Sequence, residues 1–245
     1  MVKKEKLIFA SILFVSLILF HDVKISFAET KDADLLIKES LTRFQQVSDY
    51  TCTLEKKVKK DGEVYYDPEI IVKYKRPSHY YFKWGRGEFE GQEVIYADGH
   101  HDNKLVAHTG GLFRFINLHL DPDGKKAMER NHHSLRKSGM EKIFDILDKS
   151  WSRYKETGSG SIRVTGESRI DKRDVWVVHG DFPENKGFYA AKIILYLDRE
   201  LMLPIKVSVY DWSDELYEEY TFHDLRINTG LDEADFDPDN SDYKY

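Results

Sequence analysis

The chain has 245 residues, of which 41% are hydrophobic, 33% charged and 13% aromatic, and its formal net charge is −6. A chain of this composition can bury a core, so disorder throughout is excluded. The acidic balance and the lack of long Lys/Arg blocks argue against nucleic acid as the main partner. The single cysteine excludes an internal disulfide and every metal site built from several cysteines.

The N-terminal segment is typical of an export signal. Lysines precede the apolar run 7–20, whose 14 residues are too few to span a bilayer comfortably. Ser26-Phe27-Ala28 then places small residues at the two positions that a signal peptidase reads. We expect residues 1–28 to be a cleaved secretory signal and residues 29–245 to form one domain outside the cytoplasm. An uncleaved N-terminal anchor is the alternative.

The spacing of apolar residues predicts one helix followed by many strands. Asp32–Val47 repeats apolar residues every three or four positions, and Asp32 can cap the helix. From Tyr50 the period drops to two, and Asp61-Gly62 predicts a type I′ hairpin. In this first strand Cys52 shares the apolar face, so we expect a buried, inert thiol. A second amphipathic helix is predicted over Met140–Tyr154.

Further strands are predicted around residues 70–74, 80–84, 94–97, 105–108, 162–168, 175–179, 192–197, 205–209 and 216–223. Their connections are too short for helical crossovers, so the strands should pair in antiparallel fashion. The sequence therefore predicts an α+β fold, with a large curved antiparallel sheet covered by two main helices.

One face of the C-terminal strands is apolar, as Ile193/Leu195/Leu197 and Ile205/Val207/Val209 show. Only two amphipathic helices are available to cover a sheet of eight or more strands. A curled sheet under two helices can leave an apolar hollow, or side chains can fill that space completely. The pattern alone leaves both interpretations open.

Several short blocks occur in the order found in a known superfamily. They are Val47-Ser48-Asp49-Tyr50, the hairpin at Lys60-Asp61-Gly62, Val72–Pro77 leading to Tyr81–Trp84, Val94–Gly99, and Leu195–Asp198 through Leu203–Lys206 to Tyr220–Leu225. With these blocks the chain resembles the superfamily of the periplasmic outer-membrane lipoprotein carrier (LolA-type), which includes the outer-membrane lipoprotein receptor and the sigma-E regulator. It looks closest to a family of secreted bacterial domains of unassigned function, through Glu90–Glu93, Leu120–Gly124 and the ending Phe236–Tyr245.

The resemblance implies a periplasmic, incomplete β-barrel closed by helices around an apolar cavity that accepts acyl chains. It implies neither catalytic residues nor a cofactor. Arg76, in Lys75-Arg76-Pro77, matches the carrier's arginine that hydrogen-bonds the helical lid and holds the cavity shut. An exposed arginine at a strand end is the alternative. Segment Gly110–Gly158 does not match the carrier closely, so the carrier's membrane partners are not implied.

Sequence motifs for catalysis are absent: there is no G-x-S-x-G, no G-x-x-x-x-G-K-[ST] and no H-E-x-x-H. His100-His101-Asp102 and His132-His133 carry ligand types suited to zinc or copper. However, adjacent residues of an extended chain point to opposite sides, so each pair offers one ligand. We therefore interpret both clusters as solvated loop histidines and predict no metal site.

The leading hypothesis is a secreted, non-enzymatic carrier or binding protein whose partner is a lipid or an acylated protein. Two alternatives remain: an envelope interaction or sensing module with a filled core, and a metal-dependent hydrolase or other metal-binding protein that uses the histidine clusters. The residues predicted to line the ligand cavity are Phe82, Trp84, Tyr96, Ile193, Leu195, Val207, Val209 and Phe222, with Arg76 as the lid latch.

Overall fold

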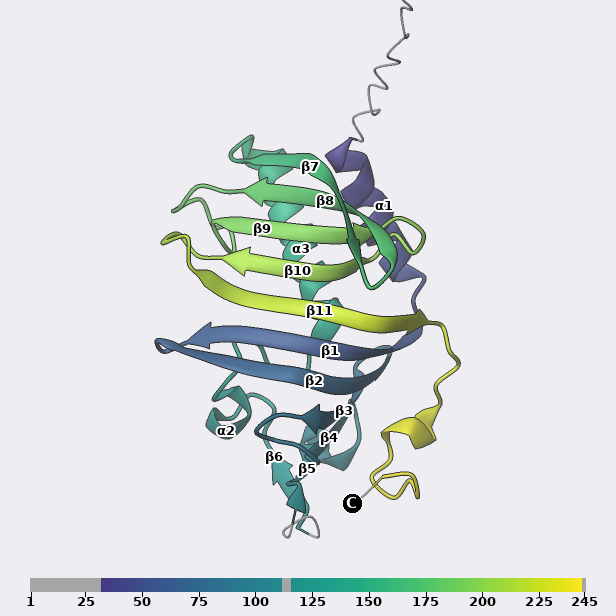
Figure 1. Cartoon of the computed structure of the whole chain (residues 1–245). Coiled ribbons are helices and arrows are strands. Elements are labelled where there is room, and N and C mark those ends of the chain that lie inside the picture. The colour runs from purple at the N-terminus through teal and green to yellow at the C-terminus, as the bar shows by residue number, and fades with distance from the viewer. Residues whose placement is uncertain (1–31, 112–115, 244–245) are drawn as a thin grey trace, which may run out of the picture. The chain divides into compact units, whose positions relative to one another are not determined.

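An antiparallel sheet of 11 strands organises the part of the chain that a computed structural model describes, residues 32–111 and 116–243. The strand order is β6-β5-β4-β3-β2-β1-β11-β10-β9-β8-β7, so the first and last long strands lie side by side at the centre of the sheet (Figure 1). The two end strands do not pair with each other within the described residues, and the barrel is therefore incomplete. The predicted α+β fold class is confirmed. The predicted signal segment lies outside the described residues.

The strands are β1 (Asp49–Lys60), β2 (Glu63–Lys75), β3 (His79–Arg86), β4 (Glu93–Ala97), β5 (Leu105–His108), β6 (Leu118–Leu120), β7 (Ser161–Ile170), β8 (Arg173–Asp181), β9 (Lys192–Asp198), β10 (Pro204–Tyr210) and β11 (Leu216–Ile227). The α-helices are α1 (Ala33–Gln45), α2 (Lys125–Met128) and α3 (Gly139–Thr157). Sequence periodicity missed only short elements such as β6 and α2, because three or four residues are too few to show a period.

Local chemistry explains where the first elements begin. The Asp32 side chain accepts a hydrogen bond from the Asp34 backbone N–H and caps α1 as expected. Asp61 and Gly62 both have positive φ, at 53° and 85°, which is the backbone conformation of a type I′ turn. Cys52 is buried, and burial raises the pKa of its thiol, so the prediction of a buried thiol is confirmed.

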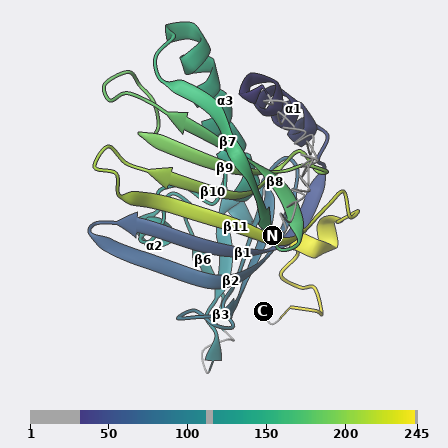
Figure 2. The same ribbon diagram turned by 45° about the horizontal axis from the view of Figure 1, so that its top comes forward.

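The two long helices cover one face of the sheet, called the inner face below (Figures 1 and 2). Their apolar sides are buried, and the rings of Phe44 in α1 and Phe144 in α3 stack with centroids 4.1 Å apart. The prediction of two main covering helices is confirmed. Among the described residues, no helix is both long and apolar enough to cross a membrane.

The chain after β11 crosses the opposite, outer face of the sheet; residues 228–243 are called the strap. Its short 3-10 helix η3 (Glu233–Phe236) places Phe236 against Tyr81 and Ile95 in a second small core. The Tyr243 ring stacks on Tyr81 with centroids 4.2 Å apart. The strap therefore seals the outer face of β3 and β4.

Candidate functional site

A row of four cavities lies between the inner face of the sheet and its cover. The largest of the four, about 170 Å³, lies at the β6 end of the row and is called the outer cavity. It is lined by β1–β6 and the segment around α2. The central cavity, about 70 Å³, lies between α3 and strands β1, β2, β3 and β11. Two small cavities of about 10 and 20 Å³ follow beneath α3 toward β8 and β9.

Neighbouring cavities share lining residues, so the four lie next to one another in a row. Trp84 and Asn131 border both the outer and the central cavity. Ile143 and Ile146 of α3 border the central cavity and the first small one. Leu195 then borders both small cavities. The inner face thus carries a row of neighbouring hollows that crosses most of the sheet.

Antiparallel register explains why apolar side chains gather along this row of cavities. Residues directly opposite each other in an antiparallel pair share a face of the sheet. Leu195 lies opposite Val207, and Val207 lies opposite Tyr220. Farther along, Ile70 lies opposite both Leu54 and Trp84.

Six of the eight residues predicted to line a ligand cavity border this row. Phe82 borders the central cavity, Trp84 the two larger ones, and Ile193, Leu195, Val207 and Val209 the small ones. Tyr96 and Phe222 are buried but border none of the four. The Tyr96 hydroxyl instead accepts from Arg136 and donates to Asp98. That any of these residues binds a ligand stays a prediction.

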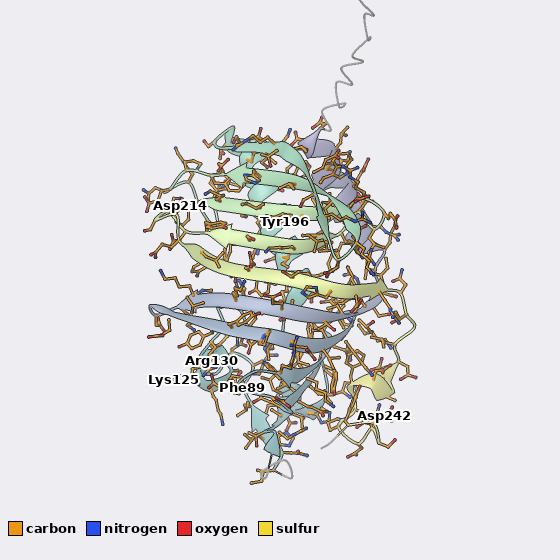
Figure 3. All side chains as sticks on the ribbon, viewed as in Figure 1. Phe89, Lys125, Arg130, Tyr196, Asp214 and Asp242 are labelled. Atoms are coloured by element: carbon orange, nitrogen blue, oxygen red, sulfur yellow. The ribbon has the colours of Figure 1, made fainter. Side chains whose placement is uncertain are left out.

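The outer cavity reaches the protein surface beside α2, because the exposed side chains of Lys126 and Glu129 belong to its lining. There Arg130 and Phe89 lie close together (Figure 3), with the guanidinium 4.5 Å from the centroid of the ring. Arg130 also pairs with Glu88 at 2.7 Å. This opening therefore combines an aromatic ring with both basic and acidic side chains.

Buried charges also border the row, which the sequence analysis did not predict. Lys56 Nζ lies 2.9 Å from the Asp67 carboxylate, and both residues are buried. Lys56 donates a further hydrogen bond to Asn131, and the Trp84 indole N–H donates to Asp67. The pair is thus neutralised and hydrogen-bonded, as a buried ion pair requires.

Glu218 of β11 is the most buried charge in the central cavity, at 1% exposed. Its carboxylate accepts hydrogen bonds from the hydroxyls of Tyr189 and Tyr220 at 2.8 and 2.9 Å. His133 Nε2 lies 3.4 Å away. Burial alone would raise the pKa of Glu218, but His133 and the two hydroxyls outweigh it and hold the pKa below its ordinary value.

The histidine pair His132-His133 differs from its predicted state as solvated loop residues. Both side chains border the central cavity, and His132 stacks on the Tyr217 ring with centroids 3.9 Å apart. The prediction was wrong for this pair because the segment before α3, although rich in polar residues, packs beneath the sheet. His100 and His101 are exposed, as expected.

Arg76 lies at the C-terminal end of α1. Its Nε donates to the Val47 carbonyl at 2.6 Å, and its Nη2 donates to the Phe44 carbonyl at 2.8 Å. The guanidinium also lies 4.8 Å from the centroid of the Phe44 ring. Arg76 therefore contacts the C-terminal end of one of the covering helices through the Phe44 carbonyl, and the turn that follows it through the Val47 carbonyl. Its function as a latch stays a prediction.

Comparison with known proteins places this architecture in a family. Residues 47–245 match the model of a family described as proteins of unknown function, DUF1571. The chain belongs to this family. The resemblance to a family of unassigned function is thereby confirmed. No curated protein matches the chain.

Solved structures support the fold. Lipoprotein LppX of Mycobacterium tuberculosis is similar with a TM-score of 0.50 and 11% identity, over 82% of this chain and 97% of LppX. The MucA/MucB complex of Pseudomonas aeruginosa has a TM-score of 0.47 and 16% identity, over 84% of this chain and 61% of the matched chain. A LolA superfamily protein from Nitrosomonas europaea has a TM-score of 0.33 and 12% identity, over 84% and 98%. At 11% identity the likeness to LppX shows a shared fold alone.

Proposed function

We propose that this protein is a non-enzymatic carrier or binding protein that holds an acyl chain of a lipid or lipoprotein in the cavity row. The observation that carries the proposal is the row of four neighbouring cavities along the inner face. A fold whose helices filled the space against the sheet would offer no such row. The fold likeness to a lipoprotein, LppX, agrees with this function.

Cavity size defines what enters without rearrangement. The outer cavity, at about 170 Å³, is comparable with an apolar cavity of about 150 Å³ that admits benzene. It therefore accepts roughly a six-carbon segment of an acyl chain. At about 0.8 kcal/mol for each buried CH₂, that segment contributes about 5 kcal/mol to binding.

A longer chain requires the cover to move. The two small cavities, at about 10 and 20 Å³, each have room for little more than a water molecule. The chain would therefore extend beneath α3 only as α3 shifts away from β9 and β10. The polar end of the ligand would stay at the surface, beside Lys126 and Arg130.

Intrinsic fluorescence tests this binding mode, because Trp84 borders both larger cavities. We expect palmitate that carries bromine along its chain to quench the protein's tryptophan emission in a saturable way. Most of this quenching should disappear in Trp84→Phe. It should persist in Trp212→Phe, since Trp212 is 42% exposed and borders none of the four cavities. Absence of saturable quenching, or equal quenching in Trp84→Phe and wild type, would contradict the proposal.

Bound lipid can also be measured directly. Solvent extraction and mass spectrometry of protein purified from its native envelope should recover lipid at close to one molecule per chain. Ala107→Phe fills the outer cavity, which Ala107 borders, and should lower that yield. Ala234→Phe, at an exposed position of the strap, should leave it unchanged. Protein free of lipid would favour the interaction-module hypothesis.

Export to the periplasm belongs to the same proposal, with residues 1–28 as the signal and 29–245 as the mature domain. N-terminal sequencing of the protein from cells is expected to begin at Glu29. A sequence that begins at Met1 would instead support an uncleaved anchor.

A further inference from the structure

Three side chains able to bind a metal meet on the outer face, where the strap crosses the beginning of β3. His79 comes from β3, His100 from the turn after β4, and Glu233 from the first residue of η3. One ligand atom from each lies within 4.8 Å of the other two. The segments are far apart in sequence, so no motif spacing reveals the group.

His79 is the residue that points to a missing ligand. It is 7% exposed, and neither ring nitrogen has a hydrogen-bond partner among the described residues. Buried polar atoms are nearly always paired, so such an exception requires an explanation. The edge-on contact with Phe236, at 5.6 Å between ring centroids, fixes the ring. Burial lowers the pKa of His79 and favours the neutral imidazole, which is the form that binds metals.

Glu233 presents a free carboxylate oxygen to this imidazole. Its Oε1 accepts a hydrogen bond from Lys75 at 2.9 Å, whereas its Oε2 lies 3.5 Å from His79 Nε2. Lys75 therefore orients the carboxylate without occupying the oxygen that faces the two histidines. Metal-binding carboxylates are commonly oriented in this way by a second hydrogen bond.

We infer that His79, His100 and Glu233 form a binding site for a divalent transition metal of the zinc type, with water completing the coordination. Two imidazoles and one carboxylate form an established zinc ligand set with an open fourth position. The ligand atoms would draw together to about 2.0–2.2 Å from the metal. His100 and Glu233 are exposed, so their side chains can adjust at small cost.

The metal would fasten the strap to the sheet. The strap is already joined to the start of β1, because the Asp49 carboxylate accepts hydrogen bonds from Thr229 and Gly230, and to β2 through the ion pair of Lys75 with Glu233. A metal at Glu233 would add a further attachment, between the strap and the start of β3. The site is separate from the cavity row, so this inference is independent of the proposed function.

The test is a titration of the purified full chain, after removal of any affinity tag, with Zn²⁺ followed by calorimetry. A parallel titration with Co²⁺ should give a visible absorption band from the coordinated ion. We expect one ion per chain, and more than about a tenfold loss of affinity in His79→Gln and in Glu233→Gln. The matched control is His101→Gln, which alters the exposed neighbour of His100 and should leave the affinity within about twofold of wild type.

Glu233→Gln and His100→Gln keep the test decisive if His79→Gln fails to fold, because both positions are exposed. Saturating Zn²⁺ should also raise the melting temperature and slow amide exchange in residues 228–243 of wild type, but not of Glu233→Gln. A wild-type protein that binds no Zn²⁺, or whose affinity is unchanged by Glu233→Gln and His100→Gln, would overturn the inference. Quenching by brominated palmitate should be the same with and without Zn²⁺.

Discussion

Replacing Arg76 by alanine is expected to speed amide hydrogen exchange in the last turn of α1 roughly 30-fold, because that end of the helix opens more often. Arg76 makes two hydrogen bonds to carbonyls at this end and stacks on the Phe44 ring. Bonds from a charged donor are worth about 1.5–3 kcal/mol each, and partial exposure of the side chain reduces this. We take about 2 kcal/mol for the whole contact, which converts to the stated factor.

Arg43→Ala is the matched control for this prediction. Arg43 lies on the same helix, but its side chain bonds only the exposed Gln46 amide among the contacts described. Its removal should change exchange in α1 by less than about threefold. Arg76→Lys should behave more like alanine than like arginine, since an ammonium group cannot reproduce the fixed fork that reaches both carbonyls.

The same variant separates a latch from a merely structural contact. If α1 controls access to the cavity row, brominated palmitate should dissociate faster from Arg76→Ala than from wild type, as measured by recovery of Trp84 emission. Faster exchange with unchanged dissociation would show that Arg76 stabilises α1 without gating the cavity. Unchanged exchange would contradict the prediction altogether.

Much of the fold follows from local sequence. Asp32 and the three- and four-residue spacing behind it define α1, and Asp61-Gly62 defines the central hairpin. Alternation along β9 and β10 identifies the inner face correctly, because Ile193 and Val209 lie opposite each other there. These features depend on residues that are close together in the chain, so a single sequence is enough to predict them.

The site depends on distant partners, which one sequence does not specify. Glu218 interrupts the apolar alternation of its strand, and such a charged position is typical of a solvent-exposed side chain. In the structure it is instead contacted by Tyr189 and His133, which come from two other segments. Likewise, the group formed by His79, His100 and Glu233 depends on where the strap crosses β3. Whether side chains fill the space beneath α3 depends on their summed volumes, which the pattern of apolar and polar residues does not give.

Glu218→Gln is expected to lower the free energy of unfolding at about pH 7 by roughly 2 kcal/mol, because the amide nitrogen cannot accept one of the tyrosine hydrogen bonds. The difference from wild type should shrink in acid. Glu218 has a folded-state pKa below its ordinary value of 4.5, so the carboxylate stabilises the fold above that value. This contribution is lost as the pH falls through the lowered folded-state pKa, and the glutamine variant never has it.

Urea unfolding of both proteins at several pH values between about 7 and 3 measures this difference. Other carboxylates with lowered pKa, such as Asp49 and Glu219, titrate in both proteins and therefore cancel in the comparison. Glu215→Gln serves as the control, because Glu215 is exposed and pairs only with Lys59 among the salt bridges described. It should cost less than about 1 kcal/mol at any pH. A gap between wild type and Glu218→Gln that stays constant down to the acid limit would mean that the buried carboxylate is not ionised, and that the tyrosine and histidine contacts act on its protonated form.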